Sequence, residues 1–456
     1  MPSTCALMLS LAAIVALAMA SEPAAGKQLV SNPTLNCPPG ANVPDQWSEC
    51  VPDWEGARCS LQATPEGLQV QAPGRPFAVG SIQQTIAGVE GGKAYAVQAS
   101  CELRGIEFPY QALTVRIEWL QGSQAVHPAG MLVRGPSVAD HHATFSDVLI
   151  APDNADGARI TLQVRWPRGG AAVWHSVSVQ PTQPPPSRKI KVGTVYLRPT
   201  DSTPAENLEL WCGQIAAAGE MGLDIVCLGE AILMVGTGQS AVQIAEPIPG
   251  PATERLATEA RKNRIWVVAG LMEIAGDCLY NTAVLLDREG QIAGKYRKVH
   301  LPREEWRKGV MPGHDYPVFH TELGTLAVQV CYDWFFPEVA TIFAQQGAQI
   351  IFAPTWGTTF PDEDGRAQGE TVFRVRARDN GVYMVPSVYD GSSMVIDPLG
   401  RILASNEGQT GVAWAEIDLN ARECLEWVGY WRAIGPRDRM PTTYEGLTDT
   451  NVRPTY

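Results

Sequence analysis

The sequence predicts an α/β protein in which a layered domain of alternating strands and helices follows an all-β sandwich domain. Three observations lead to this fold class. Residues from about 29 to 179 alternate apolar and polar side chains with period two, which indicates half-buried strands. Residues 181 to 187 read Pro-Thr-Gln-Pro-Pro-Pro-Ser, a composition that favours an extended linker. After this linker, strand-like runs alternate with helices of about ten residues, which is typical of a layered α/β domain.

The composition is that of a globular protein with an acidic surface. The chain has 456 residues, 45% of them hydrophobic and 18% charged, which is enough for two domains with sizeable cores. It carries 35 Lys and Arg against 48 Asp and Glu, and the net charge of −13 would repel a phosphate backbone. We therefore expect no nucleic acid partner. Its 7 His are scattered and no Cys-x-x-Cys pair occurs, so the sequence gives no support to a metal site.

The N-terminus has the pattern of a secretory signal peptide. An apolar run from Cys5 to Ala20 is shorter than the about 20 residues that a spanning helix needs. It ends in Ala-Met-Ala before Ser21, a small-x-small pattern that signal peptidase accepts, and no stop-transfer segment follows. We predict a signal peptide over residues 1–20, a secreted or periplasmic protein and no stable membrane span. An uncleaved anchor is the alternative, because the residues before the run include no Lys or Arg.

Residues 21–180 are predicted to form an antiparallel, jelly-roll-like β-sandwich. Short alternating stretches separated by Gly and Pro indicate its strands, as at residues 67–72, 94–99, 113–118 and 159–164. Aromatic rings stack well on sugars, so the tryptophans of this domain could provide a carbohydrate contact. The alternative is that they are core and cross-strand residues. These tryptophans are Trp47, Trp54, Trp119, Trp166 and Trp174.

A linker over residues 181–188 then leads to the second domain, residues 189–456. Its predicted helices are residues 206–218, 253–263, 337–346 and 370–379. Its predicted strands are residues 191–197, 223–228, 265–271, 280–286, 326–330, 349–353 and 381–388. Two late β segments, 392–397 and 412–417, indicate that the sheet is mixed rather than purely parallel.

Cys331 stands between a predicted strand and a predicted helix. It follows the apolar run 326–330, and Pro337 opens the helix shortly after it. A thiol on such a turn is exposed at the edge of a sheet, where helix N–H groups favour its thiolate. A cysteine at a strand end is also commonly a small buried hydrophobe, so Cys331 decides nothing alone.

Two charged residues could complete a site around that thiol. Lys298 lies in a basic stretch, residues 294–302, that follows a buried strand, although basic stretches are commonly just solvated surface. A lysine beside a thiol would lower the pKa of the thiol and later stabilise an oxyanion. Glu230 follows the apolar strand 223–228. In that position it is either a solvent-facing loop residue or a buried base that takes the thiol proton.

These three motifs, in this order, resemble those of the nitrilase (carbon-nitrogen hydrolase) superfamily. The motifs are Glu230 after an apolar strand, Lys298 within Tyr-Arg-Lys-Val-His-Leu, and Cys331 within Val-Cys-Tyr-Asp. The resemblance covers residues 189 to about 420. Further landmarks include Asp-Arg-Glu-Gly at 287–290, Met-Pro-Gly at 311–313, Pro-Thr-Trp at 354–356 and Ile-Asp-Pro-Leu-Gly at 396–400.

The resemblance implies a four-layer α-β-β-α fold and a Glu-Lys-Cys triad that cleaves a non-peptide carbon-nitrogen bond through a thioester. In that scheme Cys331 is the nucleophile, Glu230 the general base, and Lys298 with the backbone N–H of Tyr332 the oxyanion stabiliser. The family carries a second glutamate before a Pro-Gly, which would be Glu305, although Glu304 fits the motif too. No metal or organic cofactor is implied.

By the same analogy, Asp333 and Trp356 are expected in the wall of the substrate pocket together with Tyr332. Tyr332-Asp333 after the nucleophile resembles the amidase and carbamoylase branches, whereas true nitrilases typically have Trp-Glu there. The expected substrate is therefore a small amide or N-carbamoyl amide. Nitrile hydrolysis or acyl transfer by the same site is the alternative, as is an inactive secreted binding or scaffold protein. The oligomeric state is open: relatives commonly pair through helices of the α-β-β-α layer, and the N-terminal sandwich could either permit or obstruct a homodimer.

Overall fold

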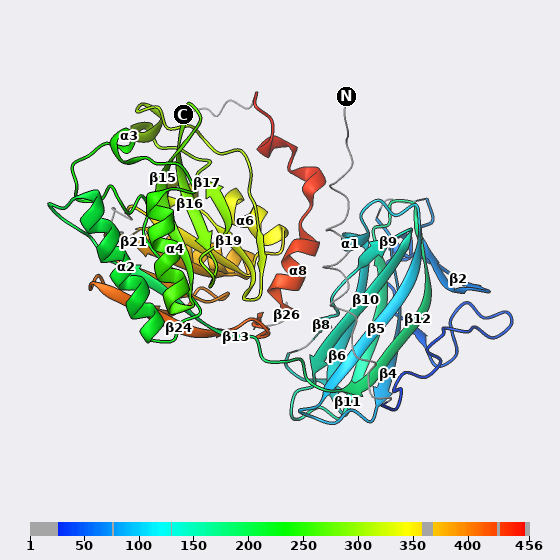
Figure 1. Ribbon diagram of the computed structural model, residues 1–456. Coiled ribbons are helices and arrows are strands. Elements are labelled where there is room, and N and C mark those ends of the chain that lie inside the picture. The colour runs from blue at the N-terminus through cyan, green and yellow to red at the C-terminus, as the bar shows by residue number, and fades with distance from the viewer. Residues whose placement is uncertain (1–25, 75–76, 129, 358–367, 426–428, 452–456) are drawn as a thin grey trace, which may run out of the picture. The chain divides into compact units, whose positions relative to one another are not determined.

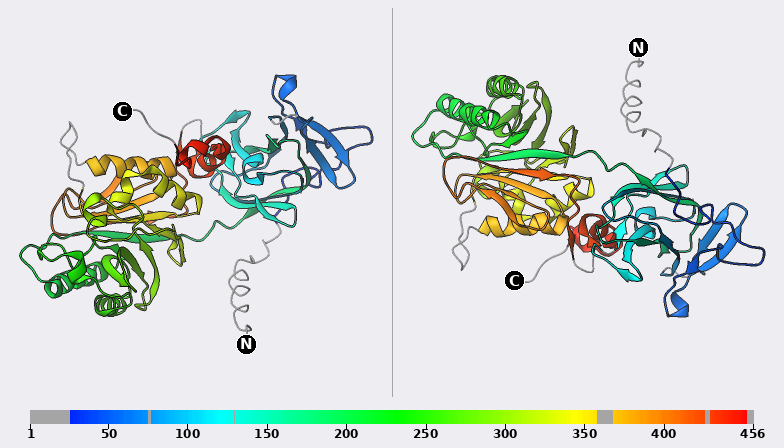
Figure 2. Two further views of the ribbon diagram at one scale, coloured as in Figure 1. Left: turned by 90° about the horizontal axis from the view of Figure 1, so that it is seen from above. Right: turned by 90° about the horizontal axis from the view of Figure 1, so that it is seen from below.

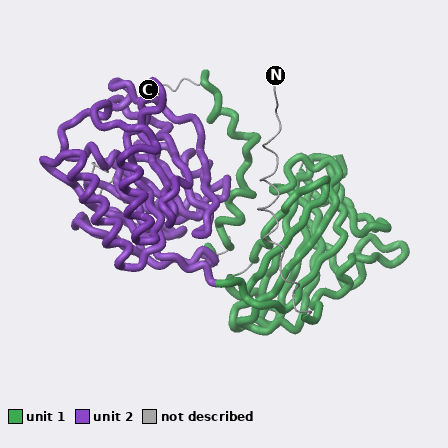
Figure 3. Tube along the Cα trace, in the orientation of Figure 1, with its two compact units in different colours: residues 1–186, 424–456 green, residues 187–423 purple. Residues whose placement is uncertain are grey.

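The computed structural model describes residues 26–74, 77–128, 130–357, 368–425 and 429–451. The chain forms two compact units, residues 1–186 together with 424–456, and residues 187–423 (Figure 3). The predicted signal peptide, residues 1–20, lies outside the described residues. Within those residues, no helix combines the length and apolar character that crossing a membrane requires.

The C-terminal segment differs from the expected domain boundary. The second domain was expected to run to residue 456, but residues 424–456 belong to the first unit. The physical reason lies in helix α8 (Trp431–Asp438), where Arg437 donates hydrogen bonds of 2.8 and 2.7 Å to the carbonyls of Tyr110 and Leu113. Nothing in the sequence pattern of residues 424–456 indicated this return to the β-rich part of the chain.

The first unit contains two six-stranded sheets in which every pairing between named strands is antiparallel. Their buried faces share one apolar core. The first sheet consists of β1 (Ser48–Glu49), β4 (Val79–Ala87), β11 (Gly157–Arg165), β6 (Leu113–Gln121), β7 (Gln124–Ala125) and β8 (Met131–Leu132). The second consists of β2 (Ser60–Thr64), β3 (Gly67–Gln71), β12 (Ala171–Thr182), β5 (Ala94–Arg104), β10 (His142–Ile150) and β9 (Ser137–Ala139). The remaining elements are η2 (Glu55–Ala57), α1 (Pro109–Ala112), β25 (Cys424–Leu425), β26 (Gly429–Tyr430), η4 (Pro441–Thr443) and η5 (Glu445–Leu447).

The tryptophans of this unit do not form one shared exposed face. Trp119 and Trp174 are fully buried and Trp47 is 7% exposed, so all three belong to the core. Trp166 is half-buried, with its ring edge against Phe77. Trp54, 78% exposed, is the one largely exposed ring among the five. The expected sugar-binding face is therefore wrong as a set of five, because alternation along β6 and β12 turns Trp119 and Trp174 inward and Trp47 is buried just before β1.

The second unit contains two further six-stranded sheets, both mixed. One sheet consists of β17 (Ile292–Arg297), β16 (Cys278–Leu286), β15 (Trp266–Ala275), β14 (Ile225–Cys227), β13 (Lys189–Tyr196) and β24 (Gly411–Asp418). The other consists of β18 (Phe319–Thr321), β19 (Gly324–Val328), β20 (Ile350–Thr355), β21 (Tyr383–Val388), β22 (Met394–Ile396) and β23 (Ile402–Ser405). The helices are α2 (Pro204–Glu220), α3 (Ala241–Ile244), α4 (Pro251–Asn263), α5 (Arg303–Trp306), η3 (Cys331–Phe335), α6 (Pro337–Gln345) and α7 (Gln368–Asn380).

The sheets of this unit lie between two layers of helices (Figures 1 and 2). Helices α2 and α4 pack on the first sheet, where Trp211 and Leu256 join one core with Val267. Helices α6 and α7 belong to the other core, where Phe343 and Phe373 join residues of both sheets. Each strand and helix that the sequence predicted for residues 191–417 is present, with ends shifted by a few residues.

Local sequence signals explain where the first of these helices begins. Thr203 caps α2 by accepting a hydrogen bond from the backbone N–H of Glu206, while the Glu206 side chain accepts one from the backbone of Thr203. Pro204 occupies the first helical position, where its missing N–H costs nothing. Buried residues at helical spacing, Trp211 and Ile215, then fix which face of the helix meets the sheet.

Candidate active site

The thiol of Cys331 sits on a strained turn directly after a strand. Its φ of +44° lies in the left-handed region, which costs a residue with a side chain of this kind about 1–3 kcal/mol. Val330 before it is extended, and η3 starts at Cys331 itself. The backbone N–H of Val330 donates to Asp333 and the N–H of Asp333 donates back to Val330, at 3.0 and 3.1 Å. Such a turn holds a nucleophile at the end of the strand, away from the sheet.

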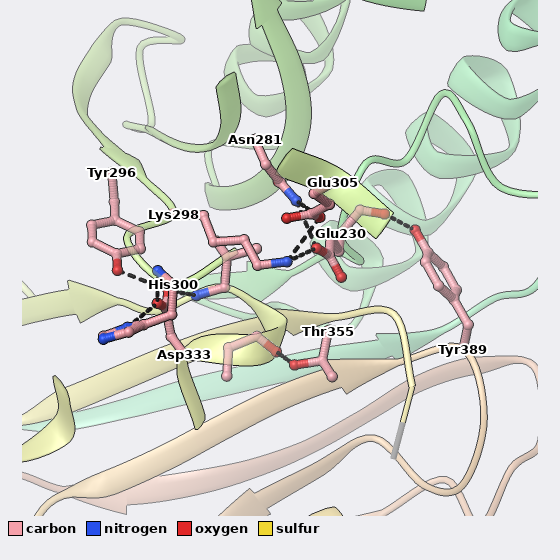
Figure 4. A network of polar contacts seen from close by, with 11 residues as sticks. Glu230, Asn281, Tyr296, Lys298, His300, Glu305, Asp333, Thr355 and Tyr389 are labelled. Atoms are coloured by element: carbon pink, nitrogen blue, oxygen red, sulfur yellow. Dashed lines mark hydrogen bonds and ion pairs between the residues drawn. The ribbon is translucent and has the colours of Figure 1, made fainter. Parts of the chain in front are cut away.

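Lys298 lies just beyond β17 and is 1% exposed. Its Nζ is 3.0 Å from Oε1 of Glu230 and 2.9 Å from Oε1 of Glu305 (Figure 4). Asn281 of β16 donates to the same two oxygens through Nδ2, at 2.7 and 2.9 Å. A buried ammonium requires this compensation, since an unpaired charge in the interior is prohibitive.

Glu230 follows β14 and is 2% exposed. The hydroxyl of Tyr389 donates a hydrogen bond of 2.6 Å to the backbone carbonyl of Glu230, which holds the backbone in place at this residue. Gly270 of the neighbouring strand passes close by, and a Cβ there would lie 2.7 Å from the Cα of Glu230. The local backbone therefore requires a glycine at residue 270 so that Glu230 can occupy this position.

The electrostatics of the site oppose a free thiolate and favour a charged lysine. Burial raises the pKa of the Cys331 thiol, the charge of Glu230 raises it further, and Lys298 lowers it only in part. Burial lowers the pKa of Lys298, but Glu230, Cys331 and Glu305 outweigh that effect and raise it above the usual value. Burial also raises the pKa of Glu305, against the opposing charge of Lys298. Removal of the thiol proton thus calls for an adjacent base.

Two carboxylate oxygens are left without a hydrogen bond inside this network. Oε2 of Glu230 and Oε2 of Glu305 are buried and have no hydrogen-bond partner within the part of the chain that the structure describes. Oε1 of each residue is held by Lys298 and Asn281. One oxygen of each carboxylate is thereby fixed while the other can exchange a proton or bind a substrate N–H.

Of the two candidates for the second glutamate, one contacts Lys298 and the other does not. Glu305 of α5 reaches Lys298, whereas the side chain of Glu304 is 72% exposed and lies 3.9 Å from Arg303. Sequence alone left this choice open. Adjacent helical residues point about 100° apart, so in α5 only one of the two side chains faces the lysine, and the role of Glu305 as the second glutamate of the family stays a prediction.

Asp333 has a different place from the pocket wall in which it was expected. It is fully buried, and its Oδ1 accepts from both the backbone N–H and Nδ1 of His300, each at 2.9 Å (Figure 4). Its Oδ2 accepts from the hydroxyl of Tyr296 at 2.8 Å and from the N–H of Val330. With both oxygens used inside the protein, Asp333 joins the segment that carries Lys298 to the turn that carries Cys331.

The other two expected pocket residues lie at the turn or near it. Tyr332 is half-buried and its ring packs against Phe335 and Phe336. Trp356, at the end of β20, is 37% exposed, and its ring edge meets Tyr389 with centroids 5.4 Å apart. The backbone amide of Trp356 lowers the pKa of the Cys331 thiol, although burial and Glu230 raise it more. Their role as pocket wall stays a prediction.

Asn281 and Tyr389 belong to the site but were not predicted from the sequence. Asn281 is a polar residue inside the predicted strand 280–286, and it is 1% exposed. A buried amide in a strand must have hydrogen-bond partners, so its position was a usable signal. Tyr389 follows β21 and gave no signal, because only the fold brings it to Glu230. Within the described ranges, no group of three or more His, Cys, Asp or Glu side chains is arranged to hold a metal ion.

The family of the chain follows from comparison with known proteins. The carbon-nitrogen hydrolase family model matches residues 191–424. The chain belongs to the carbon-nitrogen hydrolase family. The human omega-amidase NIT2 is 31% identical over 238 residues, which are 48% of this chain and 85% of that protein. A probable nitrilase of Schizosaccharomyces pombe is 31% identical over 225 residues, 46% of this chain and 79% of that protein.

The crystal structure of Saccharomyces cerevisiae Nit3, a member of branch 10 of the nitrilase superfamily, has 27% sequence identity to this hydrolase and a TM-score of 0.45. The matched region covers 50% of this chain and 90% of the Nit3 chain. The family match and the amidase relatives together make the chain an amidase-like hydrolase of carbon-nitrogen bonds. The matched residues 191–424 lie almost wholly in the second unit.

Proposed function

We propose that this hydrolase cleaves a small amide through a thioester on Cys331, with Glu230 as the general base and Lys298 as the oxyanion stabiliser. The observation that carries the proposal is the buried ammonium of Lys298, held by Glu230 and Glu305 beside the strained turn of Cys331. Carbonyl attack needs an activated nucleophile, a proton acceptor and fixed positive charge where the oxyanion develops. The site supplies one residue for each of these needs.

The Cys331 sulfur attacks the amide carbon while Glu230 takes the thiol proton, and the oxyanion forms beside Lys298 and the backbone N–H of Tyr332. Glu230 then gives its proton to the leaving nitrogen, so ammonia departs and a thioester stays on Cys331. Water attacks the thioester after Glu230 removes its proton, and the acid leaves as the proton returns to sulfur. The raised pKa of the thiol supports transfer of its proton during the attack rather than before it.

Two observations support an amide or N-carbamoyl amide as the substrate. Tyr332-Asp333 follows the nucleophile, as in the amidase and carbamoylase branches. Among the relatives at about 31% identity, those from human and other vertebrates are named omega-amidases. We therefore place short amides, including amides at the end of a carboxylic acid chain, ahead of nitriles.

The test is ammonia release from a panel of short amides, ω-amides, N-carbamoyl amino acids and nitriles. Wild type is compared with Cys331→Ala, and Cys278→Ala is the matched control because Cys278 is a half-buried cysteine at the start of β16. We expect release by wild type and by the control, none by Cys331→Ala, and an acyl adduct on Cys331 in intact-mass spectra. Release that survives in Cys331→Ala contradicts the mechanism, and no release from any substrate favours the scaffold alternative.

We also propose that the protein is exported and that signal peptidase removes residues 1–20. The apolar run and the Ala-Met-Ala site support this. Expression of the full chain in a secreting host, followed by intact-mass measurement, tests it. A mature protein that begins at Ser21 outside the cell is expected, whereas a cell-bound chain with an intact N-terminus contradicts it.

A further inference from the structure

The first unit contains a cavity that has no connection with the site described above. It has a volume of about 280 Å³ and lies between α8 and the sheet of the first unit that contains β6 and β11. Thr114, Arg116 and Glu118 of β6 line it. The residues that alternate with them along the strand are fully buried in the apolar core, namely Val115, Ile117 and Trp119. Strand alternation therefore places the polar set on the opposite face of the sheet, where the cavity is.

The charges that line this cavity do not cancel. Its cations are Arg116, Arg165 and Arg437, and its acids are Glu118 and Asp438. Asp438 pairs with Arg165 at 2.7 Å. The other acid, Glu118, pairs with Arg159 of the neighbouring strand, which is not a lining residue. Two guanidinium groups, those of Arg116 and Arg437, are left without a carboxylate partner among the described residues.

Arg437 is an unusual arginine because it is only 3% exposed. It donates to the backbone carbonyls of Tyr110, Leu113 and Gly135, which are all neutral acceptors. Its Nε has no hydrogen-bond partner within the described residues. Burial, and to a lesser degree the nearby charge of Arg165, lower its pKa, although Tyr110 and Asp438 oppose this effect. A buried cation of this kind gains stability from a negative ligand.

Arg116, in contrast to the buried Arg437, has a side chain that is free to meet a ligand. It is exposed, and no hydrogen bond or ion pair engages its side chain in the described part of the chain. A planar guanidinium with five donors matches the two oxygens of a carboxylate or phosphate group. Arg116 can therefore contact a ligand without giving up any contact that holds the sheet together.

We propose that this cavity binds a small anion with a carboxylate or phosphate group, held by Arg116 and Arg437. The volume, about 280 Å³, is near the lower end of small-molecule sites. The occupant is therefore a small molecule, and inorganic phosphate and citrate are suitable probes. Thr114 and Gln163, which also line the cavity, supply neutral hydrogen-bonding groups for the rest of such a ligand.

Isothermal titration calorimetry of the full chain, in a buffer free of phosphate and of carboxylates, tests the proposal. The probes are inorganic phosphate, citrate and the neutral sugar glucose. Arg116→Gln removes one unpaired guanidinium, and Arg104→Gln is the matched control, because Arg104 lies on β5 of the other sheet and pairs with Glu102. Thermal unfolding of both variants checks that each is folded.

We expect saturable 1:1 binding of at least one anion, none of glucose, affinity at least about tenfold lower for Arg116→Gln and unchanged affinity for Arg104→Gln. Binding of citrate alone identifies a carboxylate ligand and binding of phosphate alone a phosphate ligand. The proposal is overturned if neither anion binds saturably, if Arg116→Gln binds like wild type, or if glucose binds as well as the anions. None of these outcomes depends on the reaction at Cys331.

Discussion

Replacing Asp333 by asparagine tests whether this buried carboxylate holds the two halves of the active site together. Two of its four donors, the N–H groups of His300 and Val330, can only donate, and they face different oxygens. Asn has one oxygen, so in either orientation one of these N–H groups meets an amide NH₂. A buried N–H without an acceptor costs about 1–3 kcal/mol, and weaker bonds to the neutral oxygen add about 1 kcal/mol. We expect Asp333→Asn to lose about 2–4 kcal/mol of stability.

The assay combines urea unfolding with hydrogen exchange of the peptide that covers residues 329–336. Asp277→Asn is the control, because Asp277 is an exposed aspartate in the turn between β15 and β16. We expect faster exchange in this peptide and a lower kcat with little change in KM for Asp333→Asn alone, since a displaced turn misplaces Cys331 without removing substrate contacts. Stability and turnover equal to those of Asp277→Asn would refute the positioning role.

Three further predictions concern other carboxylates. Glu305→Gln should lower turnover by at least about tenfold while Glu304→Gln leaves it unchanged, measured as ammonia release; equal losses would contradict the α5 register. Burial raises the pKa of Glu273, but its contacts with Arg297 and Lys295 outweigh burial and lower that pKa to about 2. Ionised Glu273 therefore contributes up to about 3 kcal/mol to the free energy of unfolding above pH 4.5, and this contribution is lost as the pH falls toward 2. Acid unfolding of Glu273→Gln should lack this dependence. Glu230 raises the pKa of Cys331, so Glu230→Gln should lose hydrolysis yet react faster with iodoacetamide at pH 8; slower alkylation would count against this electrostatic account.

The long helices and most strands of the second unit could be predicted because their signals are local, whereas β17, β18, β23 and the short helices α3 and α5 were not predicted. Period, capping and proline placement act within one segment, as at Thr203 and Pro204 of α2. The return of residues 424–456 to the first unit could not be predicted, since it depends on contacts of Arg437 with backbone carbonyls more than three hundred residues earlier in the chain. No periodic pattern within a segment records such a contact.

The site could be predicted only as far as its motifs reach. Glu230, Lys298 and Cys331 each lie at or just beyond the end of an apolar run, and that is where sheets expose functional side chains. Asp333 could not be placed from sequence, because a carboxylate after a nucleophile can face either a pocket or the interior. The four hydrogen bonds that it accepts inside the protein settle which of these it does.

The two glutamates beside Lys298 have environments that suit them to different tasks. One ammonium faces two carboxylates, and both also accept from Asn281, so two full negative charges would lie close together in a buried site. Burial raises the pKa of Glu305 against the opposing charge of Lys298, which favours uptake of a proton by this carboxylate. Glu230 pairs with the lysine through one oxygen, and its second oxygen has no hydrogen-bond partner among the described residues and is available for the thiol proton. A single carboxylate would have balanced the lysine; the second one adds a proton store next to the nucleophile.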